Sequence, residues 1–179
     1  MPEINSTKTL ILGGVRSGKS RLAERVATDS NLRVCYIATA IAGDAEMCKR
    51  IAVHRDRRPV DWDLIEEPYQ LGSVLTKHAA PDRCLLIDCM TLWLTNLLTA
   101  DDVILFDAER TNLLSILPTL PGKIVLVSNE TNMGVMPMGD LSRRFCDESG
   151  VLHQDLAQLC EQVILSVAGL PHVLKGDPL

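Results

Sequence analysis

Gly13-Gly14-Val15-Arg16-Ser17-Gly18-Lys19-Ser20 matches the pattern G-x-x-x-x-G-K-S/T in full. The residues before it, 7–12, are typical of a short buried strand, and residues 21–27 place their apolar side chains on one face of a helix. The pattern indicates phosphate binding where it joins a strand to a helix, which is its context here. We therefore predict that this stretch binds a nucleoside triphosphate.

Phosphate chemistry explains these residue types and their spacing. Glycines allow backbone N–H groups to turn toward phosphate oxygens, and the N-terminus of the following helix adds a partial positive charge. Lys19 is expected to reach the β- and γ-phosphates, and the Ser20 hydroxyl to take one position on Mg²⁺. The alternative is a glycine-rich turn that only joins a strand to a helix. The agreement between the motif and its flanks favours the nucleotide.

Length and composition limit the class of protein. A chain of 179 residues is one domain of ordinary size, and 46% hydrophobic with 23% charged residues is typical of a soluble globular protein. The net charge is −5 and no run of Lys or Arg occurs, so a nucleic-acid partner is not expected. The N-terminus lacks signal-peptide features, and no apolar stretch approaches the roughly 20 residues that span a bilayer. We expect a cytoplasmic protein without membrane insertion.

The cysteines do not suggest a metal cluster. There are six, namely Cys35, Cys48, Cys84, Cys89, Cys146 and Cys160. None forms a C-x-x-C pair, and several fall inside predicted strands or helices. We expect buried, reduced thiols.

The rest of the chain alternates between strand and helix patterns. Strands are expected at residues 32–37, 62–66, 84–88, 123–128 and 163–167. Helices are expected at residues 44–54, 71–78 and 103–117, from 140 onward, and at 152–159. Asp140 is expected to cap its helix and Gly150 to interrupt it, and the residues after about Lys175 to form a loose tail.

This alternation predicts an α/β fold for residues 1–179 as a single domain. The expected class is a P-loop NTPase of RecA-like type, with an open, mostly parallel sheet and helices on both faces. Ligands of such sheets bind at the carboxyl ends of the strands. That edge is expected to gather residues 13–20, Ala38, Thr39, Ala40, Asp88 and Asn129-Glu130.

Asp88 closes the apolar run Leu85-Leu86-Ile87, as the Walker B acid does in phosphate-loop enzymes. We expect it to hold Mg²⁺ directly or through water. An acid that merely ends a strand is common, so this assignment depends on the phosphate loop.

Among four histidines, His54 has the most distinctive neighbours, because Arg55, Arg57 and Arg58 follow it. Arginines suit phosphate oxygens, and they favour a neutral imidazole that can act as a nucleophile. Judged by the spacing of these residues alone, a solvent-exposed helix end is as good an interpretation of His54 as a catalytic role. His78, His153 and His172 show no comparable pattern.

Several motifs together resemble one enzyme family. Besides residues 13–20, they are Tyr36-Ile37-Ala38-Thr39-Ala40, His54-Arg55-Asp56-Arg57-Arg58-Pro59, Ser128-Asn129-Glu130 and Met133-Gly134-Val135-Met136-Pro137. In this order they resemble the bifunctional adenosylcobinamide kinase/adenosylcobinamide-phosphate guanylyltransferase family, from about Leu10 to Lys175. The resemblance implies phosphorylation of adenosylcobinamide by ATP or GTP, followed by transfer of GMP from GTP, late in adenosylcobalamin biosynthesis.

The resemblance also implies roles for individual residues. His54 would carry GMP as a covalent intermediate, with Lys19 and Asp88 as further catalytic residues and Ser20 and Asp88 on Mg²⁺. Nucleotide contacts would fall on residues 13–20 and on Ala38, Thr39, Ala40, Arg55, Asp56, Arg57, Arg58, Glu66 and Asp88. A homotrimer is implied as well. Two departures occur, since Thr131-Asn132 stands where the family usually has Val-Gly, and His153 where it usually has Asn.

Two other classes compete with this interpretation. One is a phosphate-loop kinase of another small metabolite, with a structural His54. The other is a GTP-binding switch, which usually reads guanine through N-K-x-D, whereas residues 129–132 read NETN. The switch is therefore disfavoured.

Overall fold

The computed structural model describes residues 7–41, 43, 59–100 and 102–178. Its strands form one seven-stranded sheet in the order β3-β2-β4-β5-β1-β6-β7. All neighbouring pairs run parallel except β6 and β7, which are antiparallel. The strand that precedes the phosphate loop, β1, pairs with β5 on one side and β6 on the other. The loop therefore leaves from the interior of the sheet.

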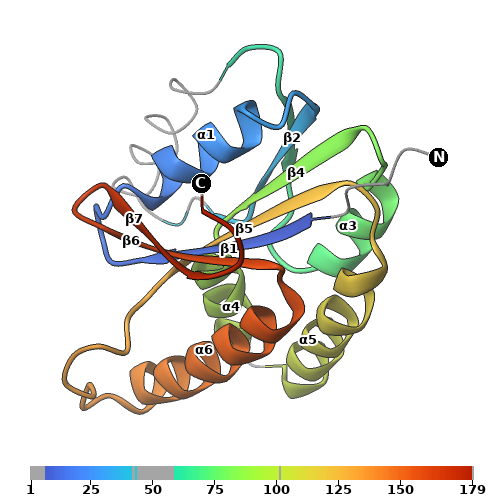
Figure 1. Cartoon of the computed structure of the whole chain (residues 1–179). Helices are drawn as coiled ribbons and strands as arrows, with labels where there is room; N and C mark the ends of the chain where they lie inside the picture. Colours follow the sequence, from blue (N-terminus) through green and yellow to red (C-terminus); the bar gives the residue numbers. More distant parts are fainter. Residues whose placement is uncertain (1–6, 42, 44–58, 101, 179) are drawn as a thin grey trace.

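The elements follow one another as strands and helices along most of the chain (Figure 1). The strands are β1 (Thr7–Gly13), β2 (Arg33–Ala38), β3 (Asp63–Glu66), β4 (Arg83–Asp88), β5 (Lys123–Asn129), β6 (Gln162–Val167) and β7 (Leu170–Lys175). The helices are α1 (Lys19–Thr28), α3 (Leu71–His78), α4 (Met90–Thr99), α5 (Val103–Ile116), the short 3-10 helix η1 (Leu117–Thr119) and α6 (Asp140–Leu159).

Helices cover both faces of the sheet, as the sequence predicts (Figure 1). Successive side chains of a strand point to opposite faces, so Ile11 packs with α1 on one face while Leu10 and Leu12 pack toward α3, α4, α5 and α6 on the other. The two apolar layers explain why strands such as residues 84–87 are apolar at every position rather than at alternate ones.

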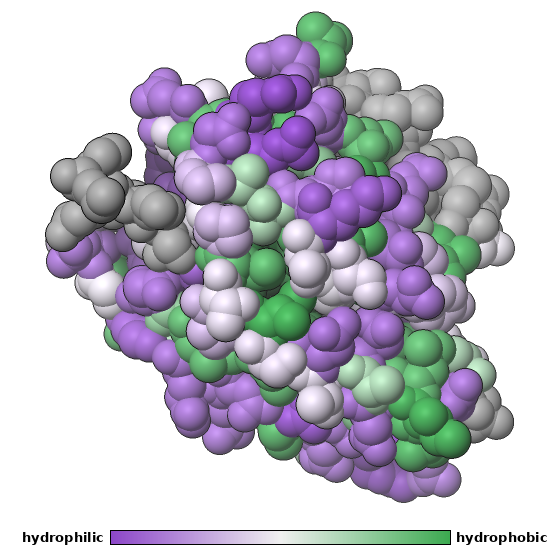
Figure 2. Space-filling view, turned by 90° about the vertical axis from the view of Figure 1, so that its right-hand side faces the viewer, coloured by the Kyte–Doolittle hydropathy of each residue, from purple (hydrophilic) through white to green (hydrophobic). Residues whose placement is uncertain are grey.

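The outer surface of the helical layer is mixed in character. Figure 2 shows the side that lies at the right of Figure 1, where hydrophobic residues form separate patches among hydrophilic ones. The apolar stripes of α3 and α5 are turned inward, since Leu71, Leu75 and Leu113 are fully buried. These helices are amphipathic, and their packing against the sheet stabilises them.

Helix α6 differs from the sequence prediction in two respects. Helix α6 is continuous from Asp140 to Leu159, so Gly150 does not interrupt it. A glycine inside a helix costs about 1 kcal/mol, whereas burying one leucine side chain contributes about 1.5–3 kcal/mol, and α6 buries Leu152 and Leu156. The predicted cap at Asp140 is also wrong, because Gly139 takes the N-cap position and Asp140 lies in the first turn.

The C-terminal hairpin is not evident from the sequence pattern. Strand β7 pairs with β6 through a two-residue turn at Ala168 and Gly169, with φ of 52° and 80°. Positive φ at both positions is what such a hairpin turn requires. Pro171 lies in β7, which is an edge strand where a missing N–H is tolerated. No helix among the described residues has the length and apolar character needed to cross a bilayer.

Candidate nucleotide-binding site

The phosphate loop lies between β1 and α1, and two of its glycines are required by geometry. At Gly13, an added Cβ would lie 2.4 Å from Ser17 Oγ and 2.6 Å from the carbonyl oxygen of Ser166. Gly18 has φ of 94°, a left-handed conformation that residues with side chains rarely adopt. The loop therefore packs close to β6, and its backbone turns sharply into the first turn of α1.

The β6–β7 hairpin holds this loop from the side. The carbonyl oxygen of Ser17 accepts hydrogen bonds from the Gly169 N–H at 2.8 Å and from Ser166 Oγ at 2.9 Å. Within the loop, the Ser17 N–H donates to the Gly14 carbonyl at 3.2 Å. These bonds fix the loop before any ligand binds. No sequence pattern indicates that a turn some 150 positions away supports the phosphate loop.

Lys19 lies over the loop. Its Nζ donates to the Gly14 carbonyl at 3.2 Å. Burial lowers the pKa of Lys19, while Cys89 and the carboxylate of Asp88 act in the opposite direction. Asp88 at the end of β4 is therefore near enough to Lys19 to interact with it electrostatically. The structure thus brings the lysine of the phosphate loop and the expected Walker B acid into one site.

The residues at this edge fit a magnesium ion. Ser20 lies in the first turn of α1, beside Lys19, and Asp88 ends β4, so a hydroxyl and a carboxylate come from elements that contact each other. Within the described residues, no group of three or more His, Cys, Asp or Glu side chains could hold a metal. Mg²⁺ in phosphate-transfer sites takes one or two protein oxygens and completes its shell with water and phosphate. Ser20 and Asp88 together offer two protein oxygens, which matches such a site.

The other predicted nucleotide contacts lie at the ends of β2 and β3, the two strands beyond β4 at the same edge of the sheet. Ala38, Thr39 and Ala40 lie at the end of β2, and Glu66 at the end of β3, which is the outermost strand on this side. Thr39 is fully buried. Its hydroxyl donates to the Cys89 carbonyl at 2.7 Å and accepts from the Cys89 N–H at 2.9 Å. This side chain ties β2 to β4. The Thr39 carbonyl in turn accepts from Asn96 Nδ2 at 2.8 Å, so both polar groups are engaged within the fold.

Part of the expected site lies outside the described residues. The predicted nucleophile His54 and the neighbouring Arg55, Asp56, Arg57 and Arg58 belong to this part. The helix expected over residues 44–54 lies there too.

A buried polar network at the end of β5 was missed by the sequence analysis. His153 on α6 is 7% exposed, and its Nε2 lies 2.8 Å from Ser128 Oγ. Its Nδ1 lies 3.6 Å from Glu130 Oε2, longer than a hydrogen bond. The Glu130 N–H in turn donates to the Gly13 carbonyl at 3.0 Å. Burial lowers the pKa of His153, and the Glu130 carboxylate opposes that shift.

The burial of His153 could have been predicted from its spacing along α6. It lies four residues after Ser149 and three before Leu156, on the buried stripe of a helix that the sequence analysis divided at Gly150. The network links α6 to the phosphate loop through β5.

A phosphate loop after an interior parallel strand, with an acid ending a nearby strand, defines the class of P-loop NTPases. Solved structures bear out this fold. An ATPase of the type III secretion system of pathogenic bacteria matches with a TM-score of 0.55 at 11% identity, over 94% of this chain and 57% of that one. The RadB recombinase matches with a TM-score of 0.53 at 15% identity, over 89% of this chain and 74% of that one. The predicted fold class, including its RecA-like type, is confirmed.

The chain belongs to the cobinamide kinase / cobinamide phosphate guanyltransferase family, whose model matches residues 9–174. It is 60% identical over 172 residues to the bifunctional adenosylcobalamin biosynthesis protein CobP of Pseudomonas aeruginosa, covering 96% of this chain and 99% of the relative. It is 38% identical over 179 residues to the bifunctional adenosylcobalamin biosynthesis protein CobU of Salmonella typhimurium, covering 93% and 98%. The resemblance stated from the motifs is therefore confirmed.

Proposed function

We propose that this protein is a bifunctional adenosylcobinamide kinase and adenosylcobinamide-phosphate guanylyltransferase. The observation that carries the proposal is a phosphate loop, with Lys19 and Asp88 in one site, in a chain that matches this family over residues 9–174. The first reaction phosphorylates the aminopropanol hydroxyl of adenosylcobinamide. The second transfers GMP from GTP onto that phosphate, giving adenosylcobinamide-GDP.

In the kinase step, the phosphate loop binds the triphosphate of ATP or GTP. Its N–H groups and the Lys19 ammonium stabilise the charge that spreads over the γ-phosphoryl oxygens as the hydroxyl attacks in line. Ser20 and Asp88 would hold Mg²⁺, which would further neutralise phosphate charge when bound. Because Gly18 and Ser17 are fixed by the fold, these groups need little rearrangement during the reaction.

In the second step, we propose that His54 is the nucleophile. A ring nitrogen attacks the α-phosphorus of GTP, a P–N bond forms, and the P–O bond to pyrophosphate breaks. A phosphate oxygen of adenosylcobinamide phosphate then attacks the same phosphorus and releases His54. Arg55, Arg57 and Arg58 would neutralise phosphate charge. The remaining nucleotide contacts would come from Ala38, Thr39, Ala40, Asp56 and Glu66.

One assay tests the activity as a whole. Purified protein is incubated with adenosylcobinamide, GTP and Mg²⁺, and the products are identified by mass. Masses of adenosylcobinamide phosphate and adenosylcobinamide-GDP are expected. Phosphorylation without any guanylylated product would favour a simple phosphate-loop kinase, and an unchanged corrinoid would rule out both activities.

A labelling experiment tests the role of His54. GTP labelled at the α-phosphate should leave label on the protein, and γ-labelled GTP should not. The label should be lost in acid, since a P–N bond is labile there, and should be absent from His54→Ala. His54→Ala should retain kinase activity, because Lys19, Ser20 and Asp88 remain. An α-label that persists in His54→Ala would contradict the assignment. We also propose the homotrimer that the family resemblance implies, and light scattering of the purified protein tests it separately.

A further inference from the structure

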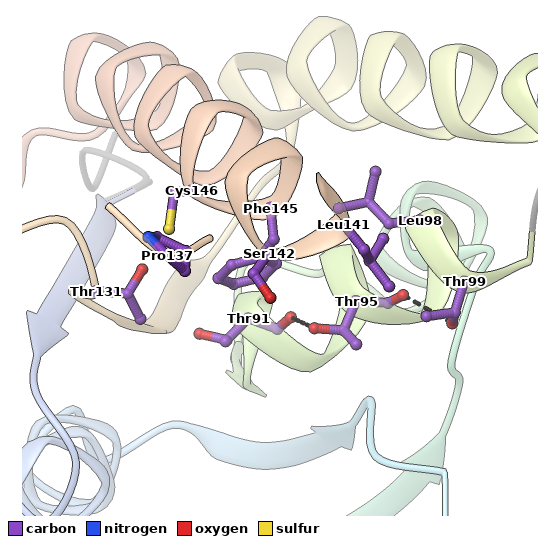
Figure 3. A pocket seen from close by; sticks show the side chains of 10 residues that line it. All are labelled: Thr91, Thr95, Leu98, Thr99, Thr131, Pro137, Leu141, Ser142, Phe145 and Cys146. Atoms are coloured by element: carbon purple, nitrogen blue, oxygen red, sulfur yellow. Dashed lines mark hydrogen bonds between the residues drawn. The ribbon is translucent and has the colours of Figure 1, made fainter. Parts of the chain in front are cut away.

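A pocket of about 370 Å³ lies between α4 and α6, next to the end of β5. On α4 it is lined by Thr91, Thr95 and Thr99, and on α6 by Leu141 and Phe145, with Pro137 of the preceding loop closing one end. Figure 3 shows the α6 side chains directed toward the threonines of α4. The pocket is a space between two helices on the face of the sheet opposite α1.

The lining suits an apolar ligand surface. The Thr95 hydroxyl donates to the Thr91 carbonyl at 2.9 Å, and the Thr99 hydroxyl donates to the Thr95 carbonyl at 2.9 Å. Since these donors are used within α4, the threonines offer the pocket mainly their methyl groups. The described residues that line the pocket include no Lys, Arg, His, Asp or Glu. A phosphate would find no cation here, and a nucleobase would find few free donors.

Thr91 joins this pocket to the nucleotide site. It lies three residues after Asp88, and its hydroxyl oxygen accepts a hydrogen bond from the Asn129 N–H at 2.7 Å. Asn129 stands beside Gly13 in the sheet, and the Glu130 N–H donates to the Gly13 carbonyl. A ligand in the pocket would therefore sit next to the phosphate loop but outside the triphosphate position.

The loop that precedes α6 carries further exposed apolar side chains. In the loop that contributes Thr131 and Pro137, Met133, Val135 and Met136 are more than half exposed, Val135 at 97%. Methionine side chains are flexible and adapt to irregular apolar surfaces. They lie in the chain between Thr131 and Pro137, two residues that line the pocket.

We propose that this pocket binds the methyl-bearing edge of the corrin ring and so holds the acceptor substrate beside the phosphate loop. The inference rests on the proposed function, which supplies a corrinoid as substrate. The corrin edge alternates methyl groups with amide-tipped side chains. The methyl groups match the lining, and the amides can stay in solvent at the mouth. The cavity takes one edge of the ring, while the aminopropanol arm extends toward the triphosphate.

Filling the pocket tests this assignment. Ser142 lines the pocket from α6 and is exposed to it, so Ser142→Phe should occupy the space that the corrin edge needs. The KM for adenosylcobinamide should rise about tenfold or more, as expected for a lost apolar contact in a binding pocket. The KM for GTP and the α-label retained from GTP should not change. The matched control is Ser115→Phe on the exposed side of α5, which should leave both KM values unchanged.

A second measurement uses the wild-type protein. Cys146 lines the same pocket and is partly accessible, whereas Cys84, Cys89 and Cys160 are buried and burial raises the pKa of each thiol, to about 11, 11 and 12. Dicyanocobinamide, which has the same ring edge but no adenosyl group, should slow alkylation of Cys146. Peptide mass spectrometry measures that rate separately for each cysteine.

The outcomes separate this inference from the proposed function. If the wild-type protein makes both corrinoid products, yet Ser142→Phe leaves the corrinoid KM unchanged, the pocket assignment is wrong. The same holds if dicyanocobinamide gives Cys146 no protection, or if protection requires the adenosyl group. A change in oligomeric state with unchanged corrinoid KM would identify the pocket as a subunit interface instead. Failure of the proposed function would appear as absence of product from wild-type protein.

Discussion

Two loops leave the carboxyl edge of the sheet side by side, and they differ in almost every respect. The phosphate loop, residues 13–20, follows β1, and the β5–α6 loop, residues 130–139, follows the neighbouring β5. The first accepts backbone hydrogen bonds from Glu130, which directly follows β5, and from Gly169 in the β6–β7 turn, and Ser17 within it is buried. The second exposes Met133, Val135 and Met138 to solvent.

The difference corresponds to what each loop is proposed to bind. A triphosphate presents a fixed arrangement of oxygens, which rigid N–H groups can match before binding. A corrinoid edge is large, irregular and partly apolar, and flexible apolar side chains can adapt to it. The β5–α6 loop is held by hydrogen bonds near its two ends. Near its start, Glu130 Oε1 accepts from the Asn132 N–H at 2.8 Å and Asn132 Nδ2 donates to the Cys146 carbonyl at 2.9 Å. Near its end, the Met138 carbonyl accepts from the Arg143 guanidinium.

The largest effect is expected at the phosphate loop. Lys19→Ala should lower both the phosphorylation of adenosylcobinamide and the GMP transfer by about 10²–10³-fold or more, because the variant loses the ammonium that reaches the Gly14 carbonyl and would stabilise phosphate charge. Steady-state rates with each substrate measure this. Thermal unfolding should remain near that of wild type. A folded variant with normal kinase turnover would show that the triphosphate lies elsewhere.

Asp88→Asn should have a smaller effect that depends on magnesium. The amide keeps the shape of the carboxylate but loses its charge, so the Mg²⁺ concentration for half-maximal activity should rise about tenfold. Titrating Mg²⁺ at fixed nucleotide concentration measures the shift. Superimposable curves for variant and wild type would argue against a metal role for Asp88.

The rigidity of the phosphate loop can be tested with two glycines. Gly13→Ala should lower the free energy of unfolding by about 1–3 kcal/mol, because the new Cβ meets the Ser166 backbone, which cannot move aside cheaply. Gly14→Ala is the matched control, since a Cβ there has nothing within 4 Å. Denaturant unfolding of both variants makes the comparison. Equal losses of unfolding free energy in the two variants would mean that the loop is not closely packed at Gly13.

The network between the two loops should make stability depend on pH. The pKa of His153 is lowered from its usual 6.5, mainly by burial, so below pH 6.5 the unfolded chain binds a proton that the folded chain does not. The contribution to stability is complete above 6.5 and is lost as the pH falls toward the lowered folded pKa. His153→Asn should therefore show a shallower decline in unfolding free energy between about pH 7 and pH 5. Parallel curves for variant and wild type would contradict this.

The smallest effect is expected in the β5–α6 loop. Val135→Ser should change the unfolding free energy by no more than about 0.5 kcal/mol, because the side chain is 97% exposed and makes little contact with the core. Denaturant unfolding without ligand measures this. A loss comparable to that of Gly13→Ala would mean that the loop packs on the protein far more tightly than its exposure indicates.

The fold class and the phosphate loop could be predicted because their determinants are local. Residues 13–20 need only their own order and the flanking strand and helix, and Asp88 was found because an apolar run ends at it. The same holds for the alternation of elements that predicts a parallel sheet with two covered faces. The proposed function came from several short motifs read together, each continuous in the chain.

Tertiary structure alone decided how distant segments meet. The turn at Ala168 and Gly169 supports Ser17, and His153 reaches Ser128, although neither pair is close in sequence. The continuity of α6 through Gly150 follows from burial of Leu152 and Leu156, which outweighs a local helix-breaking preference. The α4–α6 pocket exists only because two helices pack against the same face. Local patterns encode which element forms, whereas burial and hydrogen bonding between distant elements decide which side chains share a site.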